Sequence, residues 1–294
     1  MMRVSSFSIL TFLFVTLLAF IALSTQRADA AACTRNADGE IIDGDIDPSC
    51  TVTPDAVYFP IYKFGLCENV PTYDNYQSSC TMLFDSATAA VVEVTPTSNF
   101  NLAENLTITE GVYKAAIVLV GNTIQVRHSE VFDEDWDGID DTGADSTGKF
   151  CSTRLDSGSE DDFDSNLDCS NTPIQAGVFS ETEGAYHTAG ACSIVAGANQ
   201  SNLSFTTTSG STTVCGMLNA DTLETYTGGD TNATRQLVTQ AFTNDVTISP
   251  STTALEIAFK VTNMLSIENV IIGGVSTDYL QAYLDGFEIA IDVD

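Results

Sequence analysis

The sequence predicts an all-β protein organised as an antiparallel β-sandwich. Many short segments are rich in aromatic and β-branched residues and are separated by turn-forming residues. Two segments near the C-terminus, 255–261 and 287–293, alternate between apolar and polar residues, which is typical of strands with one buried face. No segment has the period of a convincing amphipathic helix. Many strands without helices favour two packed antiparallel sheets.

The first thirty residues have the layout of an export signal. A positive start at Arg3 precedes an apolar run over 7–23, and Ala28-Asp29-Ala30 suits cleavage by signal peptidase. We therefore expect residues 1–30 to be a signal peptide and the mature protein to be secreted or on the cell surface. The apolar run is longer than a usual signal core, so an uncleaved anchor is the alternative. No later segment predicts a membrane span.

The mature chain is predicted to be strongly acidic. Without residues 1–30, 8 basic and 39 acidic residues give a formal charge of −31. Repulsion on this scale opposes a compact state unless counter-ions bind. It also argues against nucleic acid as a partner, because such partners require clustered Lys and Arg. The charge suits either a salty environment or the binding of multivalent cations.

All the cysteines lie in the mature part, and their even number in an exported chain predicts four disulfides. The spacing suggests that neighbours pair, although the sequence does not fix the connectivity. The eight residues are Cys33, Cys50, Cys67, Cys80, Cys151, Cys169, Cys192 and Cys215.

Four regions are expected along the chain. Residues 1–30 are the signal, and 31–54 form an acidic N-terminal arm. Residues 55–132 together with 240–294 form the β-sandwich. Between them, 133–239 are a loop-rich, disulfide-pinned insertion or a second small β-domain. Pro60 interrupts a run of strand-forming residues and cannot donate to a ladder, so its strand should be an edge strand or carry a bulge.

A short motif refines the predicted sandwich. Gly111-Val112-Tyr113 leads into an apolar strand and resembles the Gly-x-Tyr element of immunoglobulin-like and transthyretin-like sandwiches. The resemblance implies one of these two sandwich types. It covers three residues only.

The strongest functional motif is the acidic segment 133–141. Aspartates at alternate positions can converge on one hard cation, and Gly138 would permit a sharp turn. The segment resembles the DxDxDGxxD calcium loops of thrombospondin type 3 repeats and, more loosely, an EF-hand loop. Ala144 stands where an EF-hand has its bidentate Glu, so we expect a calcium loop within a β-protein. The expected ligands are Asp133, Asp135, Asp137, the carbonyl of Ile139, and Asp141.

Two weaker copies of this pattern occur. The first, before Cys169, gives Asp162, Asp164, Asn166 and Asp168 as further calcium ligands. The second is Asp43-Gly44-Asp45-Ile46-Asp47 in the arm. The alternative for both is a solvated acidic turn.

No catalytic apparatus is recognisable, and we expect the protein not to be an enzyme. The two histidines, His128 and His187, are isolated, and none of the common nucleophile, phosphate-loop or zinc motifs is present. The first functional hypothesis is a calcium-stabilised structural protein that self-associates into a filament or surface layer. The alternative is an extracellular glycan- or ligand-binding module with Trp136 and Tyr186 on its surface. A secreted hydrolase with an acidic site is third.

Overall fold

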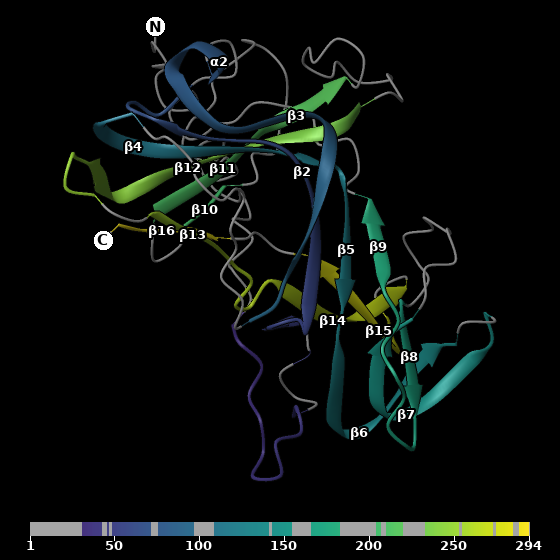
Figure 1. Ribbon diagram of the computed structural model, residues 1–294. Coiled ribbons are helices and arrows are strands. Elements are labelled where there is room, and N and C mark those ends of the chain that lie inside the picture. The colour runs from purple at the N-terminus through teal and green to yellow at the C-terminus, as the bar shows by residue number, and fades with distance from the viewer. Residues whose placement is uncertain are drawn as a thin grey trace, which may run out of the picture. The chain divides into compact units, whose positions relative to one another are not determined.

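Strands make up nearly all of the regular structure. The computed structural model describes residues 31–42, 46, 49–71, 76–96, 109–140, 143–154, 166–182, 204–206, 210–219, 233–252, 255–272, 275–284 and 288–293. Within these ranges, helix is limited to the four residues of α2 (Tyr76–Ser79). Figure 1 shows the strands arranged in several sheets. The predicted all-β class is therefore confirmed. The predicted signal peptide lies outside the described residues.

The larger sheet has eight strands in the order β10-β11-β12-β4-β2-β5-β9, with β3 also paired to β2. Its strands are β2 (Ala56–Cys67), β3 (Cys80–Val94), β4 (Gly111–Gly121), β5 (Thr123–Arg127), β9 (Phe179–Thr182), β10 (Ser204–Thr206), β11 (Gly210–Asn219) and β12 (Ala233–Ile248). Every pairing in this sheet is antiparallel. Strands β9, β10 and β11 lie in the predicted insertion, and β12 runs across its end at 239, so strand pairing crosses the boundary that the sequence suggested.

Strand β2 lies inside this sheet, where it pairs with β3 on one side and with β4 and β5 on the other. Pro60 therefore does not mark an edge strand. Instead, the ladders on both sides shift register between Ile61 and Lys63. A Cβ on Gly121, where β4 gives way to β5, would lie 2.7 Å from Pro60 Cγ. Of the two predictions for Pro60, an edge strand or a bulge, the structure has the bulge.

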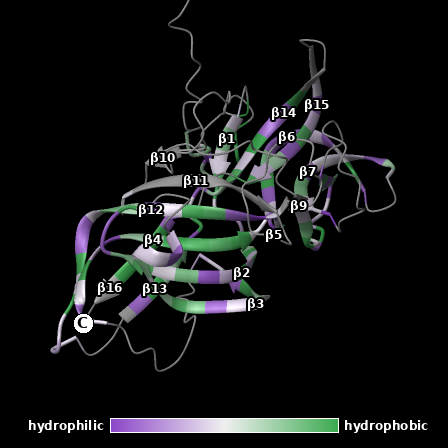
Figure 2. Cartoon of the chain, turned by 90° about the horizontal axis from the view of Figure 1, so that it is seen from above, coloured by the Kyte–Doolittle hydropathy of each residue, from purple (hydrophilic) through white to green (hydrophobic). Residues whose placement is uncertain are grey.

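Strand β4 is buried on both faces, and Ala115 to Val120 have no exposed surface. Ala116, Val118 and Val120 belong to the main core, while Ala115, Ile117 and Leu119 belong to a second, smaller cluster. Figure 2 shows the apolar character of this strand along its length. A continuous apolar run is what a strand covered on both faces requires.

The second sheet has six strands in the order β1-β14-β15-β6-β7-β8. They are β1 (Ser49–Val52), β6 (Ser129–Ile139), β7 (Asp145–Thr153), β8 (Leu167–Ser170), β14 (Leu265–Ile272) and β15 (Val275–Leu284). The sheet is mixed, because β15 and β6 run parallel where Tyr279 faces Asp137. Strands β13 (Leu255–Lys260) and β16 (Glu288–Val293) form a separate antiparallel pair. The two alternating C-terminal segments are therefore strands, as predicted.

Two buried amide side chains extend the sheets where backbone pairing stops. Asn166 donates to the carbonyl of Ala282 at 2.6 Å and accepts from its N–H at 2.8 Å. Gln240 makes the same two contacts with the backbone of Ile289, both at 2.6 Å. Each amide thus acts as a piece of strand backbone. The first joins the start of β8 to β15, and the second joins β12 to β16.

Three of the predicted disulfides are confirmed, and each joins neighbouring cysteines: Cys33–Cys50, Cys67–Cys80 and Cys151–Cys169. The fourth prediction involves Cys192, which lies outside the described residues, and Cys215, whose side chain does too. None of the helical segments in the described ranges is long and apolar enough to cross a membrane.

The side chain of Tyr113, in the Gly-x-Tyr motif, reaches back to the backbone that precedes its strand. Its hydroxyl donates to the carbonyl of Thr109, four residues upstream, at 2.7 Å. The ring is buried in the main core. This contact is of the tyrosine-corner type that occurs in Greek-key sandwiches.

Candidate functional site

Three aspartates of the first predicted calcium segment, 133–141, lie on a strand and not in a loop. Asp133, Asp135 and Asp137 are alternate residues of β6; the first two are exposed and Asp137 is half-buried. Phe132, before them, and Trp136, between Asp135 and Asp137, are buried in the core, whereas Glu134 is exposed. The segment that suggested a cation loop is therefore part of a strand, with an irregular stretch between its two buried aromatic residues.

The spacing of these carboxylates bears directly on calcium binding. Alternate residues of an extended strand are roughly 6.6 Å apart. Ligands at about 2.5 Å from one calcium ion lie within roughly 5 Å of each other. Strand β6 does leave regular pairing between Val131 and Trp136, where four residues face Lys149 alone. The irregular segment 132–135 gives Asp133 and Asp135 more freedom than a straight ladder would.

Neighbouring side chains already contact this acidic surface. Asp137 Oδ1 accepts a hydrogen bond from Thr147 Oγ1 at 2.7 Å. Lys149 pairs with Glu40 of the N-terminal arm. The hydrogen bond to Glu40, and then the charges of Glu40 and Asp135, raise the pKa of Lys149. Of the exposed residues Asp133, Glu134 and Asp135, Asp135 is therefore close enough to Lys149 to interact with its charge.

The turn expected at Gly138 occurs five residues later. Asp140 N–H donates to the carbonyl of Ala144, and Asp140 Oδ1 accepts from Ala144 N–H at 3.0 Å. Gly143 has φ 82°, which a residue with a side chain adopts only under strain. Gly138 lies on β6 beside β8, where a Cβ would come within 2.4 Å of the Leu167 carbonyl oxygen. Close approach of two strands therefore explains Gly138.

The second predicted calcium segment is only partly described. Asn166 is buried, and its amide contacts the backbone of Ala282, as given above. Asp168 lies on β8 opposite Ser152. Asp141, Asp162 and Asp164, and the arm residues Asp43, Asp45 and Asp47, lie outside the described residues. In the described part of the chain, no three His, Cys, Asp or Glu side chains are grouped so that they could hold a metal ion.

Trp136 is not available as a platform for sugar stacking. Its side chain is 6% exposed and packs against Phe132 at 6.4 Å between ring centroids, in an edge-on orientation. The glycan surface suggested from the sequence included this ring, and the burial of the ring contradicts that part of the hypothesis. Tyr186, the other suggested residue, lies outside the described residues.

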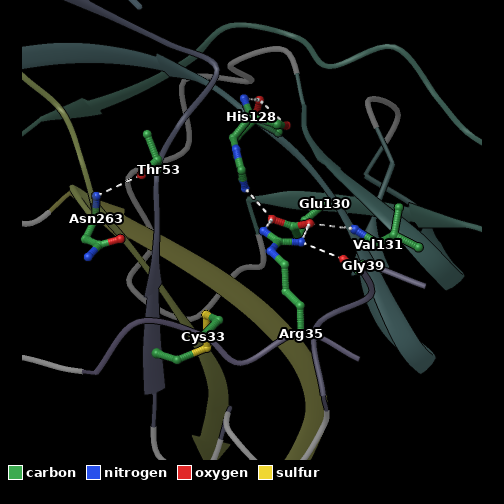
Figure 3. Close-up of polar contacts among 10 residues, drawn as sticks. Cys33, Arg35, Gly39, Thr53, His128, Glu130, Val131 and Asn263 are labelled. Atoms are coloured by element: carbon green, nitrogen blue, oxygen red, sulfur yellow. Dashed lines mark hydrogen bonds and ion pairs between the residues drawn. A yellow bond between two sulfur atoms is a disulfide. The ribbon is translucent and has the colours of Figure 1, made fainter. Parts of the chain in front are cut away.

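A charge cluster around the buried Glu130, which sequence reasoning missed, holds the N-terminal arm against β6. Glu130 is 8% exposed and accepts two hydrogen bonds from Arg35, each at 2.6 Å. The N–H of Val131 donates to the same carboxylate at 3.1 Å. His128, 3% exposed, brings Nε2 to 3.4 Å from the other carboxylate oxygen. Figure 3 shows Arg35 and His128 approaching Glu130 from opposite sides.

The ionisation of Glu130 follows from these partners. Burial alone would raise the pKa of Glu130, but the hydrogen bonds and the neighbouring positive charge outweigh it and lower the pKa to about 2. Neither ring nitrogen of His128 has a well-aligned hydrogen bond. We therefore regard the bidentate contact with Arg35 as the main cause.

The arm also pairs with β6 through its backbone. Ile41 N–H donates to the carbonyl of Val131 at 2.8 Å, and Asp133 N–H donates to the carbonyl of Ile41 at 2.9 Å. The Ile41 side chain is fully buried. The signal in the sequence was a lone basic residue, Arg35, followed by an isolated apolar pair, Ile41-Ile42, in an otherwise polar and acidic arm. Their partners lie about a hundred residues away, so no local pattern identifies them.

Comparison with protein-family models, curated proteins and solved structures finds no match to this chain.

Proposed function

We propose that this chain is an exported structural protein. It self-associates outside the cytoplasm and is stabilised by calcium. The observation that carries the proposal is the run of three consecutive exposed carboxylates on β6, Asp133, Glu134 and Asp135. The three disulfides support an oxidising, extracellular setting.

Charge gives the physical reason for calcium. Copies of a chain at −31 repel each other unless cations bind between or upon them. Divalent cations with oxygen ligands suit carboxylates that keep part of their hydration, as exposed aspartates do. Calcium bound at the irregular segment 132–135 would lower the repulsion both within β6 and between copies.

The proposed architecture is a β-sandwich of the immunoglobulin-like or transthyretin-like kind. Residues from both large sheets belong to one apolar core, including Phe64 of β2 and Leu280 of β15. The contact from Tyr113 to Thr109 is the feature that favours a Greek-key arrangement.

Calcium titration followed by the fluorescence of Trp136 tests the cation site. Trp136 is the chain's one tryptophan and lies within the acidic segment. Saturable binding by calorimetry, with a change in emission and a rise in melting temperature, is expected with Ca²⁺. The double variant Asp133→Asn with Asp135→Asn should weaken binding about tenfold or more. Glu68→Gln with Glu110→Gln, which removes two exposed carboxylates elsewhere, is the matched control.

Sedimentation and electron microscopy with and without Ca²⁺ test self-association. Ordered polymers or oligomers that form with Ca²⁺ and dissolve with a chelator are expected. A protein that stays monomeric at millimolar calcium, with no heat of binding and no change in melting temperature, would overturn the proposal.

A further inference from the structure

The outermost strand of the larger sheet offers a place for a second copy to pair. Among the described residues, β3 pairs only with β2, and Figure 2 shows it outermost in the series β12, β4, β2, β3. An unpaired strand edge presents N–H and C=O groups in register, which makes it a template for another strand. Its residue Val91 is the most exposed large apolar side chain in the described structure, at 66%.

The charges that usually protect such an edge are already paired within the chain. Asp85 forms an ion pair with Lys63 at 2.8 Å. Glu93 accepts from the Tyr58 hydroxyl at 3.1 Å and lies 3.5 Å from Arg127. Segment 90–94 contains no proline, glycine or lysine. The features that normally keep a free edge from pairing are therefore weak here.

A bulge limits how much of the edge can pair. The ladder passes from Ile61–Ala90 to Lys63–Asp85, so residues 86–89 of β3 face a single residue of β2. The bulge bends the strand and ends regular pairing at this point. The usable edge is therefore the short segment Ala90 to Val94, which suits a weak contact that needs other forces to assist it.

Pro60 indicates which backbone groups of this segment point outward. Pro60 faces Val91 across the ladder and has no N–H to donate. In an antiparallel ladder, hydrogen-bonded and non-hydrogen-bonded pairs alternate. Pro60 and Val91 fit the non-bonded kind, so the N–H and C=O of Val91 and Glu93 point away from β2.

We propose that two copies of this chain meet by antiparallel pairing of residues 90–94 along the outer edge of β3, centred on Val92. This inference rests on the self-association proposed above. The centring pairs the outward-pointing backbone groups of Val91 with those of Glu93 of the second copy, twice by symmetry. It also keeps the two Glu93 side chains from facing each other, because like charges directly opposite are destabilising. A second copy fits this edge because the segment is complementary to itself in this register.

Opposite charges placed at position 91 test the register. Val91→Asp puts a second carboxylate opposite Glu93 of the other copy, while Val91→Lys puts a cation there. Since the pair occurs twice, Val91→Asp should weaken dimerisation by about 2- to 30-fold, and Val91→Lys should strengthen it by a similar factor. Val70→Asp and Val70→Lys change the net charge identically at an exposed residue outside the strands, and serve as controls. The readout is sedimentation velocity of the purified full-length protein in Ca²⁺ over a concentration series.

The outcomes separate this inference from the function it rests on. Differences between the two residue-91 variants that exceed those between the residue-70 variants support pairing at β3. Identical behaviour at the two positions, in a wild-type protein that still associates, would overturn the β3 contact and leave self-association standing. A wild-type protein that never associates would overturn both. Circular dichroism and the melting temperature show whether each variant is folded.

Discussion

The buried carboxylate of Glu130 makes the stability of the fold depend on acidity in a way that one substitution isolates. Its pKa falls from 4.5 to about 2 on folding. One pH unit corresponds to about 1.4 kcal/mol, so ionised Glu130 contributes about 3 kcal/mol at neutral pH. Because the folded pKa is depressed, this contribution is fully present above pH 4.5 and is lost as the pH falls towards 2. Glu130 is 8% exposed, but the side chain of its partner Arg35 is 43% exposed, so solvent screening lowers this figure.

Replacing the carboxylate with an amide removes this dependence. Glu130→Gln should destabilise the protein by about 2 to 4 kcal/mol at pH 7, because Arg35 loses the charge it was paired with. The gap between wild type and variant should shrink by about 2 kcal/mol between pH 7 and pH 3, since only the wild type has this group to protonate. Urea unfolding monitored by Trp136 emission measures both values.

The comparison with an exposed carboxylate completes the test. Glu110→Gln removes the same charge from an exposed position, and should shift stability by less than about 0.5 kcal/mol at either pH. A gap between wild type and Glu130→Gln that stays the same from pH 7 to pH 3 would contradict the reasoning. It would mean that Glu130 contributes through packing and not through its ionised form.

Two further predictions concern contacts that the local sequence conceals. Asn166→Leu should cost about 2 to 4 kcal/mol in urea unfolding, because it leaves the N–H and C=O of Ala282 buried without partners; the exposed Asn171→Leu should cost less than about 0.5 kcal/mol. Gly138→Ala should lower the melting temperature more than Gly143→Ala. A Cβ at position 138 would lie 2.4 Å from a backbone oxygen, whereas a Cβ at position 143 would meet open space and only the φ of Gly143 is unfavourable. Equal losses at the two glycines would argue against close packing of β6 on β8.

The apolar strands of the fold could be predicted from the sequence because each carries its own local signal. The runs that became β2 and β4 are rich in β-branched and aromatic residues, and β13 and β16 alternate. The apolar segment 237–242 is part of the long strand β12. Segments 81–84 and 90–94 belong to one strand, β3, with a bulge between them.

Strands β6, β7 and β8 could not be predicted, because their sequences are polar and acidic. Strand β7 carries Gly148 where β8 approaches so closely that a Cβ would overlap the backbone of Ser170. A position filled by glycine adds nothing to an apolar pattern. The region was therefore expected to be a loop-rich insertion or a second small β-domain, with no strands assigned at these positions, where the structure has three.

The acidic residues of the candidate site could be identified from the sequence, but their conformation could not be predicted from it. Asp133, Asp135 and Asp137 fit both a cation loop and an outward strand face, and only the tertiary position of Trp136 separates the two. The cluster of Arg35 and Glu130 spans 95 residues, and its pairing depends on the path of the arm. Local periodicity carries no information on such contacts.

The described disulfides have a mechanical consequence. Cys67 faces Cys80 in the ladder of β2 and β3, and Cys151 faces Cys169 in that of β7 and β8. Cys33 lies beside β1, where Cys50 is located. Each disulfide therefore joins two neighbouring strands, or the arm and β1, and none of the three connects one large sheet to the other. Under a pulling force, the two large sheets can therefore separate while all three of these disulfides stay intact.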